Sequence, residues 1–258
     1  MTLPSTDRLS ALFELRERTD VRLGPRWTLA GIASYATWVL FALGVATRFN
    51  IPLLDSVQTL GLLGLLGFAS STGLSFTVYG LFSRQNKHSE RQEEILAEII
   101  KTVRGHATPG NIDVQLPLSL VEQDQHSLLE KSHEHSAILW SLLVLIPYIG
   151  WVFLMIGLYL LTQISNVHDR VERQLVEDVD RTLVASGSSS FSQIGRIPSS
   201  RNSAAYLAAS LATLGIIALA WLYVLIIGED AHFYYHSSIE PELAKSLQYS
   251  GMGSVRVS

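Results

Sequence analysis

Four long stretches of this chain carry no charged side chain, and they limit its fold more than any other feature. They lie at 27–47, 59–82, 137–165 and 204–227. A helix needs roughly 20 apolar residues to cross a bilayer, and each stretch meets that length. Inside lipid a backbone must satisfy its own polar groups, which a helix does. The stretches therefore predict an all-α, polytopic membrane protein that is integral and multi-pass.

The remaining composition excludes several functions. The net charge is −4 and no long basic stripe is present, so a nucleic-acid partner has no support. The chain has no cysteine, which excludes disulfides, thiolate metal sites and cysteine nucleophiles. A charged segment of about 26 residues precedes the first apolar stretch, so we expect that stretch to remain as an anchor and not to be cleaved as a signal peptide.

Polar and apolar segments alternate along the chain, and this alternation divides it. The expected parts are an amphipathic N-terminal segment (1–26), a transmembrane hairpin (27–83), cytoplasmic helices with a linker (84–136), a third membrane segment (137–165), an amphipathic helix with a Ser/Gly linker (166–203), a fourth membrane segment (204–227) and a polar C-terminal tail (228–258).

The second apolar stretch is rich in small residues, among them Gly61, Gly64, Gly67 and Gly73. Small residues let two membrane helices approach closely. This face is predicted to pack on a neighbouring helix of the same chain or, as the less favoured alternative, at a dimer interface.

One pattern recurs three times. Each copy has a tyrosine near the end of an apolar stretch, a histidine nine positions later, and apolar residues seven, eleven and fifteen positions after the histidine. The tyrosines and histidines are Tyr79 with His88, Tyr159 with His168, and Tyr223 with His232. Three matches without a gap predict duplication of one unit.

The recurring pattern also predicts where the histidines point. At 100° per residue, offsets of seven, eleven and fifteen return close to the histidine's own helix face. Each histidine is thus expected on a packed stripe and not on a solvated side. In the third copy Pro241 is expected to end one helix or start another.

Two topologies remain open. If all four stretches span, residues 166–203 should be poor in basic residues, yet they contain five arginines. Alternatively, the third and fourth stretches return to their starting side, bent at 147–150 and at Gly215. Such re-entrant turns require burial by protein, because lipid cannot satisfy freed backbone groups.

The fourth stretch carries Arg201-Asn202 at its start, Thr213-Leu214-Gly215-Ile216 in its middle and Trp221-Leu222-Tyr223 at its end. It resembles a family of small prokaryotic membrane domains catalogued only as a domain of unknown function (number four-two-three-four). Ile217 stands where that family has tyrosine. The third stretch matches more weakly. The resemblance covers the last third of the chain and implies a prokaryotic cell-membrane protein with a helical unit in the membrane, and no known activity.

The histidines are the best chemical lead. His88, His168 and His232 would converge if the three units packed around one axis, and His236 follows His232 by one helical turn. Three neutral imidazoles suit zinc or a similar ion. The competing interpretation is that each histidine is hydrogen-bonded, with Asn86, Asn166 and Asp230 as candidate partners.

No nucleophile motif, phosphate loop or dinucleotide fingerprint is present, so we expect neither an enzyme nor a cofactor. The predicted role is structural or interactive: a scaffold, an accessory subunit of a membrane complex or a homo-oligomer embedded in the lipid bilayer. The alternative is a small channel or transport protein, whose axis would be lined by Ser70, Ser71, Thr72 and Ser75.

Overall fold

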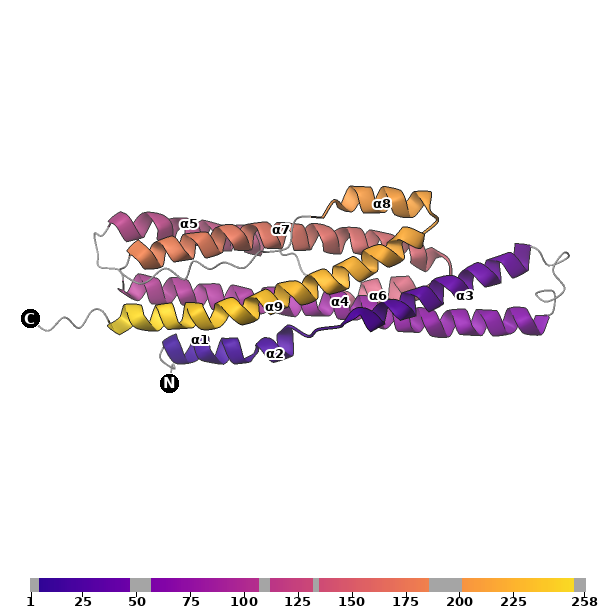
Figure 1. Ribbon diagram of the computed structural model, residues 1–258, viewed down its shortest axis with the longest axis horizontal. Coiled ribbons are helices and arrows are strands. Elements are labelled where there is room, and N and C mark those ends of the chain that lie inside the picture. The colour runs from indigo at the N-terminus through magenta and orange to yellow at the C-terminus, as the bar shows by residue number, and fades with distance from the viewer. Residues whose placement is uncertain (1–4, 47–56, 107–111, 132–134, 186–200, 253–258) are drawn as a thin grey trace, which may run out of the picture.

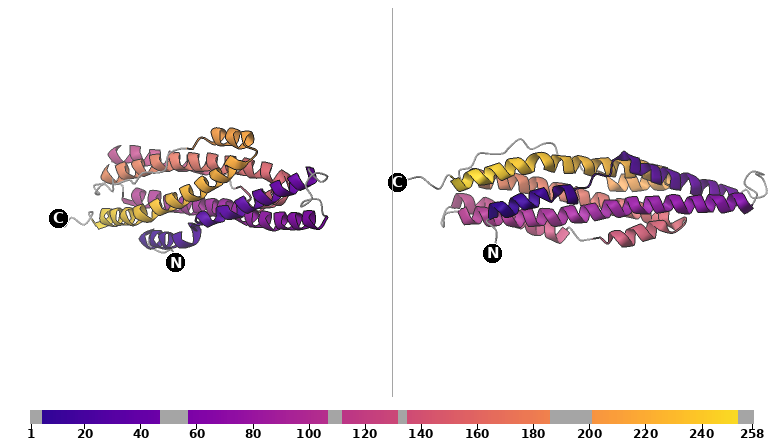
Figure 2. Two further views of the ribbon diagram at one scale, coloured as in Figure 1. Left: turned by 45° about the vertical axis from the view of Figure 1, so that its right-hand side comes forward. Right: turned by 90° about the horizontal axis from the view of Figure 1, so that it is seen from below.

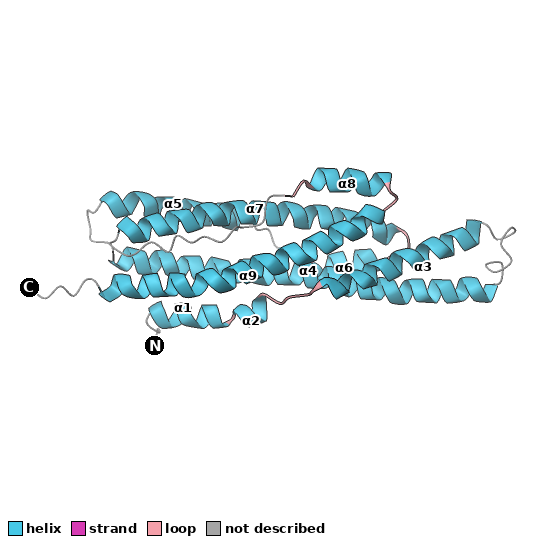
Figure 3. Cartoon of the chain, in the orientation of Figure 1, coloured by secondary structure: helices cyan, strands magenta, loops and turns pink. Residues whose placement is uncertain are grey.

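The computed structural model describes residues 5–46, 57–106, 112–131, 135–185 and 201–252, and every regular element in these ranges is a helix (Figure 3). The elements are α1 (Ser5–Glu14), α2 (Arg16–Thr19), the 3₁₀ turn η1 (Pro25–Trp27), α3 (Thr28–Ala46), α4 (Val57–His106), α5 (Ile112–Lys131), α6 (Ala137–Leu145), α7 (Ile149–Ala185), α8 (Ser203–Ala212) and α9 (Ile216–Met252). Four candidate spans within these ranges are long and apolar enough to cross a membrane. The all-α membrane fold is therefore confirmed. Most of the expected Ser/Gly linker, at 186–200, lies outside the described residues.

Three long helices, α4, α7 and α9, lie lengthwise together and run in the same direction (Figures 1 and 2). Each is preceded by a shorter helix that runs the opposite way: α3 before α4, α6 before α7, and α8 before α9. The chain thus forms three helical hairpins whose long arms all leave at the same end. At that end α5 packs against α7, and α1 packs against α4 and α9.

The third and fourth apolar stretches fold back on themselves. α6 has 9 residues and α8 has 10. At 1.5 Å per residue each is about 15 Å long, half of the roughly 30 Å hydrocarbon core. Neither can cross a membrane alone, so the hairpin topology applies here and the single kinked span does not.

Unusual backbone angles form the two sharp turns. Tyr148 has φ 61° between α6 and α7, and Leu214 and Gly215 have φ 52° and 98° between α8 and α9. The Tyr35 hydroxyl of α3 donates to the Leu214 carbonyl at 3.1 Å. This bond satisfies a carbonyl that the interrupted helix leaves free, as a turn at membrane depth requires.

Large aliphatic side chains on the hairpins point outward. Leu29, Leu65 and Ile138 are between 63% and 66% exposed, and Leu214 is 86% exposed. Contiguous apolar surface of this kind is unfavourable in water and is what lipid tails cover. The hairpins are therefore the membrane part, and the polar arms extend beyond it.

Small residues of α4 bring α3 close. A Cβ on Gly67 would lie 3.1 Å from the Trp38 ring, and one on Gly64 would lie 3.3 Å from Phe41. Both aromatic residues belong to α3, the partner helix of the same hairpin. The predicted packing within one chain is thus confirmed at these positions.

Proline does not interrupt two of the helices. α9 continues through Pro241, so the expectation that a helix ends or starts there was wrong. A proline inside a helix costs about 3 kcal/mol. Burial of Ile239 and Leu243 and the ion pair of Glu240 with Arg91 offset that cost, and Pro241 itself faces outward. α5 likewise continues through Pro117.

Each long arm also binds the start of another hairpin. The Asn86 side chain of α4 donates to the His135 carbonyl just before α6, and Asn166 of α7 exchanges two hydrogen bonds with the Arg201 backbone before α8. Asp230 of α9 accepts from the amides of Leu23 and Gly24, which precede α3. The three hairpins are joined in a closed ring by these contacts.

Candidate metal centre

The three arms pack in layers, with one residue from each helix in every layer. Buried positions on α4 alternate at spacings of four and three, the heptad spacing of helices that pack lengthwise in a coiled coil. The equivalent positions on α7 and α9 are buried as well. From the membrane outward the layers are Leu81, Leu161 and Leu225; Gln85, Ser165 and Glu229; His88, His168 and His232; Gln92, Glu172 and His236; and Ile95, Leu175 and Ile239.

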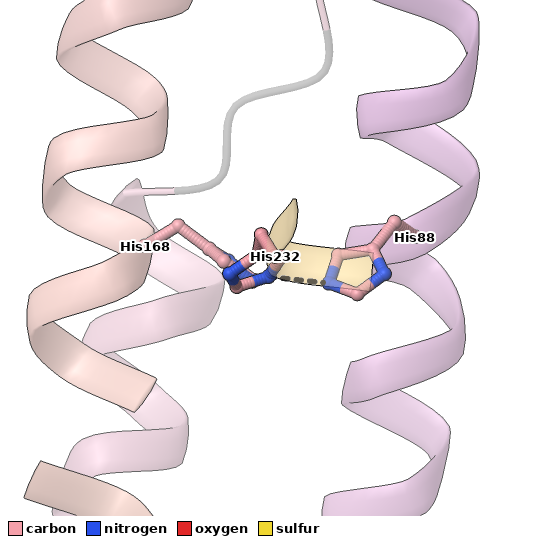
Figure 4. Close-up of side chains that lie close together, drawn as sticks. All are labelled: His88, His168 and His232. Carbon is pink, nitrogen blue, oxygen red and sulfur yellow. Dashed lines mark hydrogen bonds between the residues drawn. The ribbon is translucent and has the colours of Figure 1, made fainter. Parts of the chain in front are cut away.

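The histidine layer brings three imidazoles together from three helices (Figure 4). One ring nitrogen from each of His88, His168 and His232 lies within 4.8 Å of the others, and all three side chains are buried. The Nε2 atoms of His88 and His232 are 3.2 Å apart. The predicted convergence of these histidines on one axis is thus a feature of the bundle.

The next layer adds a fourth imidazole and a carboxylate. His236 Nε2 lies 3.1 Å from His232 Nε2 and 2.6 Å from Glu172 Oε1. The other carboxylate oxygen, Glu172 Oε2, is 3.5 Å from His232 Nε2. Glu172, His232 and His236 therefore form a second set of three donor atoms within 4.8 Å of one another, and this set shares His232 with the first.

Outer residues hold two of the rings in place through their Nδ1 atoms. His88 Nδ1 donates to Asp20 Oδ1 at 3.0 Å, and the Gln92 amide donates to His236 Nδ1 at 3.1 Å. Asp169 Oδ1 lies 3.3 Å from His232 Nδ1, close to it but without a hydrogen bond. In metal sites a group that binds the far nitrogen of a ligand imidazole fixes its tautomer and its orientation.

Arg91 compensates the charge of these outer carboxylates. It donates to Asp20 Oδ2 and to Glu240 Oε1, both at 2.7 Å, and all three side chains are buried. Since Asp20 follows α2, this network also fastens the N-terminal segment to the arms of α4 and α9.

Several polar atoms at the centre have no hydrogen-bond partner among the described residues. The carboxylate oxygen Glu172 Oε2 and both ring nitrogens of His168 are buried and lack such a partner. His88 Nδ1 carries the proton that goes to Asp20, so the neutral ring has only a lone pair at Nε2 to face His232. A buried polar group without a partner is costly, and a cation at the centre would take lone pairs from His88 Nε2, from one nitrogen of His168 and from Glu172 Oε2.

The histidine layer lies nine residues beyond Tyr79, Tyr159 and Tyr223, outside the apolar stretches. Burial and the neighbouring histidines lower the pKa of His88 well below its usual value. Burial also lowers the pKa of His232, against the opposing charge of Glu172. Burial alone would lower the pKa of His236 and raise that of Glu172, but their mutual attraction reverses both shifts. Burial lowers the pKa of His168 as well, so three of the four imidazoles are held neutral, the form that binds metal ions.

The sequence prediction and the structure agree in part. His88, His168, His232 and His236 all lie in this cluster. The suggested pairing of the histidines with Asn86, Asn166 and Asp230 was wrong, because those residues bind backbone groups ahead of the hairpins. His133 lies outside the described residues, and His135 stacks on Phe82, outside both donor sets.

Sequence reasoning missed Glu172, Asp20 and Arg91. Glu172 follows His168 by four residues, as His236 follows His232, and this shared offset was a usable signal. Asp20 and Arg91 gave no such signal, since Asp20 is 68 residues from His88 and 71 from Arg91 along the chain.

The fold defines a helical, multi-pass class of membrane protein. Beyond that class, no protein-family model, curated protein or solved structure matches the chain. The resemblance of the last third to the prokaryotic membrane-domain family stays a prediction, and the chemistry of the centre follows from its own residues.

Proposed function

We propose that this chain is a metal-binding membrane protein of structural or interaction type, in which one transition-metal ion, zinc or a similar ion, fixes three membrane hairpins to one another. The observation that carries the proposal is the convergence of one ring nitrogen each from the buried His88, His168 and His232 within 4.8 Å. Neither ring nitrogen of His168 has a hydrogen-bond partner among the described residues, so at least one is free to bind an ion.

The distances fit coordination. Zinc binds imidazole nitrogen at about 2.0–2.1 Å, so two nitrogens of a tetrahedral site are about 3.3 Å apart. The separations of His232 Nε2 from the Nε2 atoms of His88 and His236 are 3.2 and 3.1 Å. The two donor sets share His232, so the proposal places a single ion at this residue, with the other four side chains as its candidate ligands.

A structural role follows from the origin of the ligands. They come from α4, α7 and α9, one arm of each hairpin, so an ion ties all three hairpins together where the arms leave the membrane. Structural metal sites stabilise folds directly, because the assembled ligands exist only in the folded state. The proposal includes no catalytic step. The protein would act in the cell membrane of a prokaryote, as a homo-oligomer or as a subunit of a larger complex.

The test is stoichiometric metal analysis of detergent-purified protein. The parent chain should carry about one ion, His168→Ala should lose most of it, and His126→Ala should keep it. His126 is a suitable control because it is an exposed histidine on α5. Metal-free parent protein of normal stability, after exposure to zinc, iron and manganese salts, would refute the proposal.

Contacts of the hydroxyl groups favour this role over a channel. Ser71 and Ser70 pair with Ser34 and Thr37 of α3, and Ser75 donates to the Ser141 carbonyl of α6. These groups join helices instead of facing a common path. Ion flux through liposomes that contain the purified protein would support the channel alternative.

A further inference from the structure

An apolar cavity lies directly beyond the metal centre. Its wall includes Ile95, Ile99, Leu175 and Val179 from α4 and α7, and Glu172 and His236 close its end toward the histidine layer. The cavity offers about 40 Å³ to the centres of water-sized molecules, and one such molecule needs about 10–15 Å³. It therefore has room for a very small molecule and not for a large substrate, and its aliphatic wall favours an apolar occupant.

The opposite side of the centre is polar. A second cavity, of about 10 Å³ by the same measure, is lined by Ser165, His168, Asp169, Arg201 and other polar groups. That volume suits a single water molecule. The centre thus has one polar face suited to water and one face whose cavity is lined mainly by aliphatic side chains.

The donor set on the apolar side restricts the choice of ion. Glu172, His232 and His236 supply one carboxylate and two imidazoles. With metal–ligand bonds of about 2.1 Å, donors at right angles are about 3.0 Å apart. Here the Nε2 atoms of His232 and His236 are 3.1 Å apart. His236 Nε2 lies 2.6 Å from Glu172 Oε1, and His232 Nε2 lies 3.5 Å from Glu172 Oε2. Two histidines and one carboxylate on one face are characteristic of non-haem ferrous iron, and with His88 and His168 also bound one of six octahedral positions stays open.

We propose that the centre binds ferrous iron, and that the iron takes a diatomic gas of the O₂ or NO class as a further ligand from the apolar cavity. This inference rests on the proposed metal site and adds the identity of the ion and of its exchangeable ligand. Three features of the centre support this binding: the donor set, a cavity that two of the donors line, and a cavity size that suits very small molecules. The proposal concerns reversible binding, and no electron transfer to the gas is part of it.

Nitric oxide is the best probe, because its adduct with ferrous iron has a distinctive half-integer-spin resonance. Full-length protein in detergent is loaded anaerobically with ferrous iron, its iron content is measured, and NO is titrated. We expect an iron–nitrosyl signal in proportion to bound iron. Val179→Phe fills the cavity and should weaken NO binding by about tenfold or more without loss of iron. The control Val184→Phe places the same side chain at an exposed position of the same helix.

Ile99→Phe, on the opposite wall from Val179, serves as the second variant if Val179→Phe does not fold. Protein that binds iron but gives no nitrosyl signal would overturn the inference, as would filled variants that bind NO like the parent. Protein that accepts zinc but not iron would also overturn it and leave the structural metal site intact. Failure to bind any metal would remove the proposed function itself.

Discussion

The membrane half and the polar half of the bundle are held together by different forces. In the membrane half, buried aliphatic and aromatic side chains such as Leu161, Leu225 and Trp221 fill the core, and isolated hydroxyl contacts join the helices. In the polar half an aliphatic core continues, but the histidine layer and the Arg91 network interrupt it. Lipid gives little hydrophobic gain for pairing apolar helices, so close packing and single hydrogen bonds stabilise the first half. The second half lies in water, so burial of its aliphatic side chains stabilises it through the hydrophobic effect. Its buried polar centre is tolerated only because the charges there are compensated.

The largest effect should come from Arg91. Arg91→Ala leaves the buried carboxylates of Asp20 and Glu240 without their shared partner, and breaking such a pair costs about 3–5 kcal/mol. Thermal unfolding in detergent measures the loss. Arg181→Ala is the control: its side chain is 62% exposed in an ion pair with Asp178, and such pairs contribute about 0–1 kcal/mol. Equal effects of the two substitutions would contradict the difference drawn between buried and surface charge.

Metal binding should stabilise the polar half selectively. At a free ion concentration of about 100 times Kd, the expected gain is about 2.7 kcal/mol. Hydrogen exchange should slow near His88, Glu172 and His236, with little change in α3. In His168→Ala the protection should largely disappear. Uniform protection along all helices would mean that the ion acts on the whole fold and not on the polar half.

Close approach of α3 and α4 predicts a smaller effect in the membrane half. Gly67→Ala places a Cβ 3.1 Å from the Trp38 ring, so the helices must separate slightly, at a cost of about 1–3 kcal/mol. Gly61→Ala meets no atom within 4 Å and should be neutral or stabilising by up to about 1 kcal/mol. Both free energies come from reversible unfolding in detergent. A neutral Gly67→Ala would show that the contact tolerates a methyl group.

The smallest expected effect concerns one hydroxyl. Ser71→Ala removes contacts with the Trp38 indole N–H at 2.7 Å and with the Ser34 hydroxyl at 3.0 Å. Hydrogen bonds between membrane helices contribute about 0.6–1.7 kcal/mol. Thr72→Ala, whose hydroxyl donates to the Phe68 carbonyl within its own helix, is the matched control and should change stability by less than about 0.5 kcal/mol. A loss above that of Gly67→Ala would reverse the order proposed for the two kinds of contact.

The two halves also differ in what their sequence could predict. The length of the uncharged runs was sufficient to predict the membrane stretches, because lipid tolerates few alternatives to a helix. The histidines were found because a constant offset puts equivalent residues at equivalent heights on parallel helices. The hydrogen-bond partners suggested for them were wrong for a geometric reason. Asn86 and His88 are two positions apart, and side chains at that spacing point in different directions on a helix. Asp20 and Arg91 depend on how the N-terminal segment folds back, which no local pattern encodes.

The ring of contacts through Asn86, Asn166 and Asp230 sets an order on biogenesis. Two of its links can form as soon as the second and third hairpins enter the bilayer, since each joins an arm to the segment that follows it in the chain. The last link joins Asp230 to the amides of Leu23 and Gly24, which are synthesised first and must wait for nearly the whole chain. Closure of the ring at Asp230 therefore comes last and marks insertion of the third hairpin, although Asp20 can already hold the N-terminal segment on α4 through His88 and Arg91.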